Sequence, residues 1–394
     1  MANFILFDSP TDRKNLLPLS FLRPLSLIRV GILTIKEKWE KYLQKTCSFQ
    51  TEAYLSDKYF SQIDYQLPTF YINGSVCPNQ KLCDAILGLE DKQMLVSSKN
   101  EIIAYKAYSD INFESFEKIT FESPFTKISY SFDIFGYNGE QIQEDFKLIT
   151  KNRQSQPITD PHTIVYKPEN VFIEEGADLK ACVLNAEKGV IYIGKNTQIQ
   201  EMSVIHGNFA LCEGSVVNIG GKMRGDTTIG PYSKVGGEIS NSVIFGYSNK
   251  AHDGFLGNSV LAEWCNLGAD TNTSNLKNNY SKVKVWNYNQ EDFINTDKQF
   301  CGLTMGDYSK SGINTMFNTG TVVGISSNIF GGDFPPKFIP SFMWGSDQSN
   351  FEVFEFEKAL EAAERMMQRR NIPLTEADKK ILLNVFERRF KLKQ

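Results

Sequence analysis

The chain has 394 residues, of which 41% are hydrophobic and 22% are charged, as in a globular protein long enough for two cores. A formal net charge of -4 argues against nucleic acid and against an anionic membrane surface as partners. No stretch approaches the roughly eighteen apolar residues that span a bilayer, and the first residues lack the basic start of a signal peptide. We therefore expect a cytoplasmic protein with no membrane partner.

The seven cysteines are scattered along the chain and show neither a CxxC pair nor the spacing of zinc ligands. In a chain of this length, such cysteines are typical of reduced, buried thiols rather than of a disulfide framework. We predict no metal site from them.

Residues 1–160 have the pattern of an α/β domain. The short apolar run at residues 4–7 predicts a buried strand followed by a loop, and residues 28–43 carry apolar side chains at helical spacing. Further strands are predicted at residues 70–72, 93–96 and 101–108. Alternation of strands and helices of this kind favours an α/β sheet.

A basic loop follows the first predicted strand and contains Arg13 and Arg23. Open α/β sheets bind ligands beyond the carboxyl ends of their strands, and arginine suits phosphate recognition. The loop is therefore a candidate phosphate site. A basic loop that is simply solvated is the competing interpretation, and the residues alone leave both open.

The same loop, with its segment Pro18-Leu19-Ser20, resembles the sugar-nucleotide pyrophosphorylases, which are nucleotidyltransferases. The resemblance implies nucleotide or phosphate contacts from Arg13, Arg23, Asn73 and Gly74. The loop at residues 8–12 lacks the family's glycines, and Ser75 stands where the family has an aspartate that holds Mg²⁺. Mg²⁺ is expected only if this domain is active, and sugar-nucleotide binding is expected with or without nucleotidyl transfer.

A repeat of six residues begins beyond the polar, proline-containing segment 151–161. Aliphatic residues keep this step without a break at Ile193, Ile199, Ile205, Leu211, Val217, Met223, Ile229 and Val235, and the phase is predicted to resume at Phe255, Leu261 and Leu267. Six is neither the period of a helix nor that of a strand. It is typical of a parallel β-helix built from hexapeptide repeats. The breaks at residues 236–250 and 270–300 are predicted to form loops that carry a site.

His252 lies between these breaks, beside Lys250, Asp253 and Gly254. A neutral imidazole can act as a general base near pH 7, but a lone histidine is often only a structural hydrogen-bonding residue. Residue types alone leave these two interpretations of His252 equally open. For His162 and His206 we favour the structural one.

Three segments of this region resemble one family. Lys250-Ala251-His252, Asn266-Leu267-Gly268-Ala269-Asp270 and Ser274-Asn275-Leu276 resemble the acetyltransferase half of the bifunctional UDP-N-acetylglucosamine pyrophosphorylase/glucosamine-1-phosphate N-acetyltransferases. The 23 residues from His252 to Asn275 match that family's spacing. The chain resembles in particular a variant from Bacteroidetes-type bacteria. The resemblance implies a left-handed β-helix and a homotrimer.

The resemblance also implies roles for individual residues. His252 would be the general base, Asn275 would orient the amino sugar, and the backbone N–H of Ala269 would stabilise the oxyanion. Substrate binding is expected from Arg224, Phe255, Asn266, Lys277, Lys284 and Lys250. Contacts to acetyl-CoA, or to another acyl-CoA, are expected from Gly268, Asp270 and Lys337. Phe255 replaces the family's tyrosine, which leaves the acceptor sugar open.

The tail beyond Pro335-Pro336 has helical spacing at residues 351–370, and Thr375 with Asp378 predicts a capping box for a second helix at residues 375–390. We therefore expect an α/β nucleotidyltransferase-like domain at 1–160, an all-β left-handed parallel β-helix at 161–345 and a helical tail at 346–394.

The predicted function is acyl-CoA-dependent N-acyl transfer to an amino sugar phosphate or a nucleotide sugar. Two alternatives stay open. One is a bifunctional enzyme whose N-terminal domain also transfers nucleotide, and the other is a non-catalytic scaffold that binds sugar nucleotides.

Overall fold

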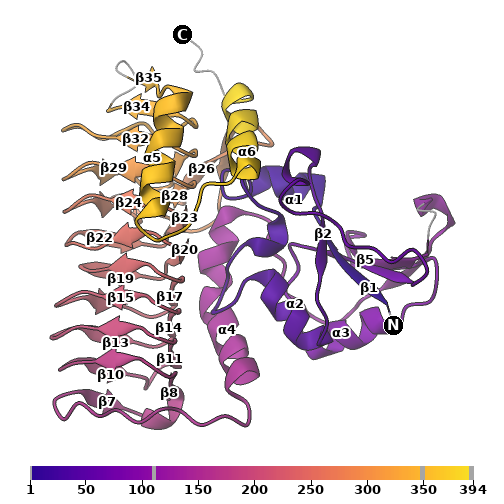
Figure 1. The fold of residues 1–394 in the computed structure, drawn as a ribbon, viewed down its shortest axis with the longest axis horizontal. Helices are drawn as coiled ribbons and strands as arrows, with labels where there is room; N and C mark the ends of the chain where they lie inside the picture. Colours follow the sequence, from indigo (N-terminus) through magenta and orange to yellow (C-terminus); the bar gives the residue numbers. More distant parts are fainter. Residues whose placement is uncertain (1, 109–111, 347–350, 390–394) are drawn as a thin grey trace. The chain divides into compact units, whose positions relative to one another are not determined.

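The computed structural model describes residues 2–108, 112–346 and 351–389 (Figure 1). The chain packs as two compact units. The first comprises residues 1–16, 22–28 and 33–130, and the second comprises residues 17–21, 29–32 and 131–394. The two compact units divide at residue 130. The predicted domain boundary near residue 160 stays a prediction.

The first unit is built on a mixed sheet. Among the described residues, the sheet has six strands in the order β2-β1-β3-β5-β4-β6. Their bounds are β1 Asn3–Phe7, β2 Ser48–Gln50, β3 Thr69–Asn73, β4 Gln93–Val96, β5 Ile102–Ala107 and β6 Glu117–Thr120. The helices are α1 Pro10–Asn15, α2 Ile35–Leu43 and α3 Gln80–Leu87, with short 3-10 turns at Leu25–Leu27, Ala53–Leu55 and Phe113–Ser115.

The predicted strands of this unit are confirmed, but the predicted helix over residues 28–43 is too long. Helix α2 begins only after Thr34, whose side chain accepts a hydrogen bond from the backbone N–H of Glu37 in a capping box. The N-terminal seven residues of the predicted helix lie outside it because this cap defines the helix start.

The second unit is a parallel β-helix, as predicted, with three faces that the chain visits in turn. We call them faces A, B and C. Face A contains β7 Ile164–Tyr166, β10 Val183–Asn185, β13 Val204–His206, β16 Lys222–Met223, β19 Glu238–Ser240 and β22 Phe255–Gly257. Face B contains β8 Val171–Ile173, β11 Ile191–Ile193, β14 Phe209–Leu211, β17 Thr227–Ile229, β20 Val243–Gly246, β23 Val260–Glu263, β28 Thr304–Met305, β31 Val322–Val323 and β33 Phe338–Ile339.

Face C contains β9 Asp178–Leu179, β12 Gln198–Ile199, β15 Val216–Val217, β18 Lys234–Val235, β21 Asn249–Lys250, β24 Asn266–Leu267, β29 Lys310–Ser311, β32 Asn328–Ile329 and β34 Met343–Gly345, and ends with the antiparallel β35 Glu352–Val353. Strands β25 Asn272–Thr273 and β30 Met316–Phe317 pair with each other beyond face A, next to β22. A short 3-10 turn, Pro168–Asn170, precedes β8.

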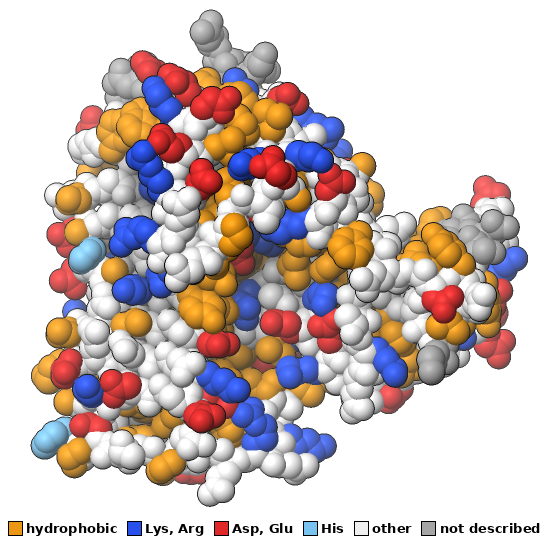
Figure 2. Space-filling view, viewed as in Figure 1, with side chains coloured by type: hydrophobic (Ala, Val, Ile, Leu, Met, Phe, Trp, Pro, Cys, Tyr) orange, Lys and Arg blue, Asp and Glu red, His pale blue; other side chains and the backbone are white. Residues whose placement is uncertain are grey.

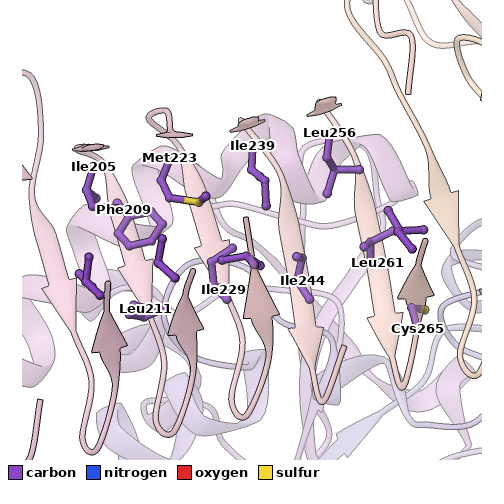
Figure 3. Close-up of a cluster of buried hydrophobic side chains, with 14 of the residues drawn as sticks. Ile205, Phe209, Leu211, Met223, Ile229, Ile239, Ile244, Leu256, Leu261 and Cys265 are labelled. Carbon is purple, nitrogen blue, oxygen red and sulfur yellow. The ribbon is translucent and has the colours of Figure 1, made fainter. Parts of the chain in front are cut away.

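The core of the coil is a stack of aliphatic side chains that point inward from all three faces. Figure 3 shows Ile205, Met223, Ile239 and Leu256 projecting from successive strands of face A toward side chains of face B. Each of these four side chains is completely buried. The predicted phase is wrong at one point, because the inward residue of β22 is Leu256, whereas Phe255 is half-buried on the outer surface.

The two predicted breaks in the period have different structures. At the first, the turn from face C to face A shrinks to Gly236 and Gly237, between β18 and β19, whereas four residues link β15 to β16. The break is therefore a shortening of the coil and not the predicted loop. At the second, the chain leaves the coil in a hairpin of β26 Lys284–Asn287 and β27 Asp292–Asn295, as predicted.

Helices accompany the coil. Helix α4, Ser131–Thr150, packs against strands of face B, where the Asn138 amide donates to the carbonyl of Asp226. In the tail, α5 spans Phe356–Gln368 and α6 spans Glu376–Glu387, and the capping box of Thr375 and Asp378 is confirmed. The predicted end of the second helix at residue 390 lies outside the described residues. No helix in the described ranges combines the length and the apolar character needed to cross a membrane.

Candidate active site

The turn that carries His252 joins face C to face A of the coil. It comprises residues 251–254, between β21 and β22. It stacks directly on the shortened Gly236–Gly237 turn of the preceding coil, where a Cβ on Gly237 would lie 2.9 Å from the carbonyl oxygen of His252. Only glycine leaves room for this stacking. The imidazole of His252 is exposed.

Two cavities meet at His252. One, of about 530 Å³, lies along face C, and we call it the face-C cavity. The other, of about 570 Å³, lies under the His252 turn, and we call it the notch. The notch is lined by Gln200, Asn218, Ile219, Gly236, Gly237, Asp253, Ala269 and Asp270 in addition to Ala251 and His252. It exists because the two-residue turn at Gly236 and Gly237 is shorter than the turns above and below it.

The face-C cavity combines aromatic and cationic side chains. Tyr247 and Trp264 are stacked with their ring centroids 4.4 Å apart at the turns between faces B and C. Lys234 lies in its lining, and Arg369 and Arg370 reach it from the residues that follow α5. The hydroxyl of Tyr308 contacts the sulfur of Met367 in α5 at 3.3 Å, which ties this helix to the coil.

Several residues predicted to contact the substrate, the oxyanion or the acyl donor lie in these cavities. Asn266, Gly268 and Ala269 line the face-C cavity, and Ala269 and Asp270 line the notch. The backbone N–H of Gly268 is occupied by the carbonyl oxygen of Ser311 at 3.1 Å. That of Ala269 donates to no acceptor within the described residues. Of these two N–H groups, Ala269 is therefore the one open to a ligand.

Two of the predicted substrate-binding residues, Arg224 and Phe255, lie on face A. Arg224 follows β16 and forms a 3.2 Å ion pair with Glu238, which itself pairs in register with Phe255 on β22. The arginine side chain is two-thirds exposed, at 66%, so the ion pair is weak and a phosphate can displace it.

Asn275 lies at the far end of face A from His252. His252 precedes β22, whereas Asn275 follows β25, the next strand along this face. The Asn275 amide donates to Asn258 Oδ1 at 2.8 Å. The Phe255 ring and the Asn275 amide both lie over Gly257, where a Cβ would come within 2.7 Å of each. Phe255 thus connects the histidine end of the face to the asparagine end.

Lys277, predicted to bind the substrate, and Lys337, predicted to contact acyl-CoA, lie close together near Asn275, and Lys337 lines neither cavity. Burial lowers the pKa of Lys337, and the nearby charge of Lys277 lowers it further. Lys337 also donates to the hydroxyl of Thr319 at 3.3 Å. An anion near these two ammonium groups would relieve their repulsion. Lys284, by contrast, is exposed at the start of the β26 hairpin and lines neither cavity.

The expected role of Lys250 as a substrate-binding residue is wrong. Its side chain points into the coil and is only 1% exposed. Its ammonium group donates to the backbone carbonyls of His252 and Asp253. It therefore contacts the backbone of the histidine turn from within the core.

Parts of the chain are similar in sequence to known proteins. Residues 4–154 match the family model for sugar nucleotidyl transferase. A bifunctional protein GlmU of Methanococcus aeolicus is 32% identical over 90 residues, which is 23% of this chain and 21% of that protein. A bifunctional sugar-1-phosphate nucleotidylyltransferase/acetyltransferase of Sulfurisphaera tokodaii is 29% identical over 147 residues, or 37% and 36% of the two chains.

Parts of the chain are therefore similar to the sugar nucleotidyl transferase family and to bifunctional GlmU proteins. The matches span about a fifth to a third of the length of these curated relatives. Among solved structures, the polySia-specific acetyltransferase NeuO matches with a TM-score of 0.26 at 14% identity over 49% of this chain and 83% of that one. The resemblance to a Bacteroidetes-type variant stays a prediction.

The unit that matches the sugar nucleotidyl transferase model uses its predicted phosphate residues for its own structure. Arg13 donates to Asp8 at 2.7 Å, to the carbonyl of Arg23 and to the hydroxyl of Tyr54. Both members of the Arg13–Asp8 pair are buried, with side chains 5% and 4% exposed. Burial raises the pKa of Asp8, while Arg13 acts in the opposite direction.

The other three predicted phosphate residues are enclosed as well. Arg23 and Asn73 are 5% and 3% exposed. Asn73 Oδ1 accepts hydrogen bonds from the backbone and the hydroxyl of Ser75, and Gly74 donates its N–H to the carbonyl of Phe7. The expectation that these residues face a nucleotide is not met, because they are buried within the first unit.

The position expected to hold Mg²⁺ in an active domain is occupied by a hydrogen-bonded serine. Ser75 Oγ lies 3.1 Å from Asp12 Oδ2, and Lys127 forms an ion pair with the other oxygen of Asp12, also at 3.1 Å. Lys127 also pairs with Glu101 at 3.0 Å. A lysine that neutralises the carboxylates beside Ser75 leaves a poor ligand set for a hard cation. In residues 2–108, 112–346 and 351–389, no group of three or more His, Cys, Asp or Glu residues is arranged to hold a metal ion.

Figure 2 shows acidic and basic side chains interspersed over the visible surface.

Sequence reasoning missed Arg369 and Arg370 as parts of the candidate site. Their sequence neighbourhood is an ordinary charged helix end, and only the packing of α5 on the coil brings them to the face-C cavity.

Proposed function

We propose that this chain is an acyltransferase that moves an acyl group from acyl-CoA to the amine of an amino sugar phosphate or a nucleotide sugar. The observation that supports this best is the exposed imidazole of His252 at the junction of two cavities. From this position a general base can face a donor in the face-C cavity, while face A begins at the end of the same turn.

The face-C cavity suits the donor. Coenzyme A carries a planar adenine and several phosphate groups, and the cavity offers stacked aromatic rings with three cations, Lys234, Arg369 and Arg370. The open N–H of Ala269 lies in the lining of the same cavity. It is therefore our candidate for the hydrogen bond to the thioester oxygen.

Face A suits the acceptor. Arg224 would bind the sugar phosphate, Phe255 would pack against the sugar ring, and Asn275 would hydrogen-bond to it. Lys277 and Lys337 offer a second place for negative charge, which a nucleotide sugar would need and a monophosphate would not.

The chemistry then needs only these groups. His252 accepts a proton from the sugar amine as the nitrogen attacks the thioester carbonyl carbon, and the Ala269 N–H stabilises the resulting oxyanion. When the tetrahedral intermediate collapses, the C–S bond breaks and the imidazolium returns the proton to the leaving thiolate. The products are an N-acylated sugar and free CoA.

A homotrimer and a cytoplasmic location are further parts of the proposal. The turns between faces C and A carry exposed apolar side chains on both sides of His252, including Met202, Ile219 and Ile313, which are 74%, 70% and 69% exposed. Such a row favours association with another copy of the coil.

Nucleotidyl transfer by the first unit is a second candidate function, favoured by the family match over residues 4–154. The buried Arg13 and the Ser75–Asp12–Lys127 cluster argue against it. A non-catalytic scaffold is the third possibility. It would require that neither cavity supports turnover.

The test is release of CoA from acetyl-CoA in the presence of glucosamine-1-phosphate or a UDP-linked amino sugar, with N-acetylglucosamine-1-phosphate as the control that lacks a free amine. A thiol reagent can follow it, because all seven cysteines are buried. We expect CoA release only with a free amine. Absence of amine-dependent release with every acceptor would contradict acyl transfer. Pyrophosphate release from UTP or dTTP with a sugar-1-phosphate, with and without Mg²⁺, tests the second function.

A further inference from the structure

Lys250 occupies a position in the coil that belongs to an aliphatic residue. In the strand register of face C, Lys250 pairs with Val235 of the preceding coil, and Val217, Val235 and Leu267 of this face are all core residues. Lys250 is among the largest completely buried side chains of the chain. A charged side chain therefore interrupts the stack one coil above the shortened turn.

The ammonium group of Lys250 is bound by backbone carbonyls alone. It donates to His252 O, to Asp253 O at 2.9 Å and to Gly236 O at 3.4 Å. These acceptors use its three N–H bonds. No carboxylate of the described residues forms an ion pair with it, so the carbonyl dipoles are its only direct partners.

Burial of this charge is costly for folding. Burial lowers the pKa of Lys250 to about 8, although Asp253 and Asp270 act in the opposite direction. An aliphatic side chain would fill the same space without that cost, and replacement of buried charges by apolar residues is often neutral or stabilising. Stability of the coil therefore does not explain the presence of a lysine here.

What the lysine does locally is fix the backbone of the histidine turn. The carbonyl of Ala251 accepts from the Asn218 amide at 2.8 Å, and that of Asp253 accepts from the N–H of Asp270 at 3.1 Å. Lys250 supplies the hydrogen bond to His252 O. All three carbonyls of Ala251, His252 and Asp253 are thus held, while the imidazole stays exposed.

We propose that Lys250 is a positioning residue that holds the main chain of His252 from inside the coil, so that the imidazole stands at a fixed place between the two cavities. This inference rests on the proposed acyl transfer for its catalytic meaning. Its structural content, the restraint of the turn at residues 251–254, can be tested without any activity.

The experiment compares Lys250→Met, which fills the core without donors, with Lys250→Gln, which keeps an uncharged donor. Ile229→Met is the matched control, because Ile229 is equally buried in the same core. Hydrogen exchange of the Glu238 and Asp270 amides, which donate to the carbonyls of Gly254 and Asp253, reports restraint of the turn. Acetyl-CoA kinetics report positioning of the base, since misplacement of a catalytic group costs rate more than binding.

We expect Lys250→Met to remain folded, to exchange these amides about tenfold or more faster, and to lose about 10- to 100-fold in kcat with little change in the KM for the amino sugar. Lys250→Gln should recover part of both effects, and Ile229→Met should show neither. A folded Lys250→Met protein whose amides exchange as slowly as those of the wild type would overturn the proposal. If Lys250→Met fails to fold, wild-type exchange in Lys250→Gln together with full kcat would overturn it.

The proposed function can fail separately from this inference. If the wild type shows no acyl transfer but Lys250→Met still accelerates exchange of the Glu238 and Asp270 amides, then the restraint stands and the assigned chemistry is wrong. If acyl transfer is present and Lys250→Met keeps both its kcat and its slow exchange, the chemistry stands and the role of Lys250 is wrong.

Discussion

The buried ammonium of Lys250 donates a hydrogen bond to the backbone carbonyl of the exposed His252, two residues along the chain. One hydrogen bond therefore links a core side chain to the turn that carries the candidate catalytic residue. The two-residue turn at Gly236 and Gly237 explains why this turn is accessible, since it leaves the notch beneath it.

The pH dependence of stability should carry the signature of Lys250. Because the pKa of Lys250 falls from 10.5 to about 8 on folding, the unfolded chain binds more protons than the folded protein between these values. The free energy of unfolding therefore rises with pH in that window through this group. Denaturant unfolding at about pH 7.5, 9 and 10 should show the wild type gaining stability relative to Lys250→Met. A difference that stays constant with pH would contradict a buried, charged lysine.

The arginines that follow α5 should bind the donor. Replacing Arg369 and Arg370 by alanine is expected to raise the KM for acetyl-CoA about tenfold or more while changing kcat by less than about threefold. The reason is that the two arginines would bind acetyl-CoA equally in the ground state and in the transition state. Arg365→Ala is the matched control, since Arg365 lies on α5 but pairs with Glu361. Equal effects of the control and the double variant would argue against a donor site in the face-C cavity.

The Gly236–Gly237 turn should be essential for the site. Gly237 has φ +66° and a Cβ there would meet Gly254 O, Asp253 Cα and His252 O at 2.8 to 2.9 Å. Gly237→Ala should therefore displace His252 and abolish most activity. Gly220→Ala is the control, because Gly220 has φ +69° but no atom within 4 Å of its Cβ. It should cost only about 1–2 kcal/mol of stability and leave turnover intact. Similar activity of the two variants would show that the close stacking is unimportant.

Arg13 should matter for stability and not for acyl transfer. Arg13→Ala leaves the buried Asp8 carboxylate without its partner, and loss of one member of such a pair costs about 3–5 kcal/mol. Thermal unfolding should show a destabilised first unit, with acetyl-CoA turnover of the folded protein unchanged. The exposed Lys14 is the control position. If Arg13→Ala is as stable as Lys14→Ala but loses nucleotide binding, Arg13 is a ligand-binding residue after all.

The sequence period predicted the coil because every buried aliphatic residue must return to the axis after one face. The six-residue spacing also holds within the segment that the prediction treated as a break in the period. Ile244, Lys250 and Leu256 are spaced by six, and this spacing places Lys250 in the inward series. A lysine is not expected in an aliphatic stack, so its position was assigned by resemblance to the substrate side instead.

Other features of the site were beyond the sequence pattern. The placement of His252 and Asn275 at opposite ends of face A depends on how β22 and β25 lie next to each other in successive coils. The position of Arg369 and Arg370 depends on how the tail folds back. The closure of the Arg13 loop depends on a buried carboxylate, Asp8, that the motif comparison did not consider. Each of these is a tertiary effect that a local pattern does not encode.

The most direct measurement is the steady-state rate of amine-dependent CoA release by His252→Gln. His162→Gln is the matched control, since His162 is also exposed but lines neither cavity. If His252 is the general base, His252→Gln should lower kcat by about 10²- to 10⁴-fold with a small change in KM, and His162→Gln should retain wild-type kcat. A His252→Gln protein that keeps wild-type kcat would contradict acyl transfer at this turn.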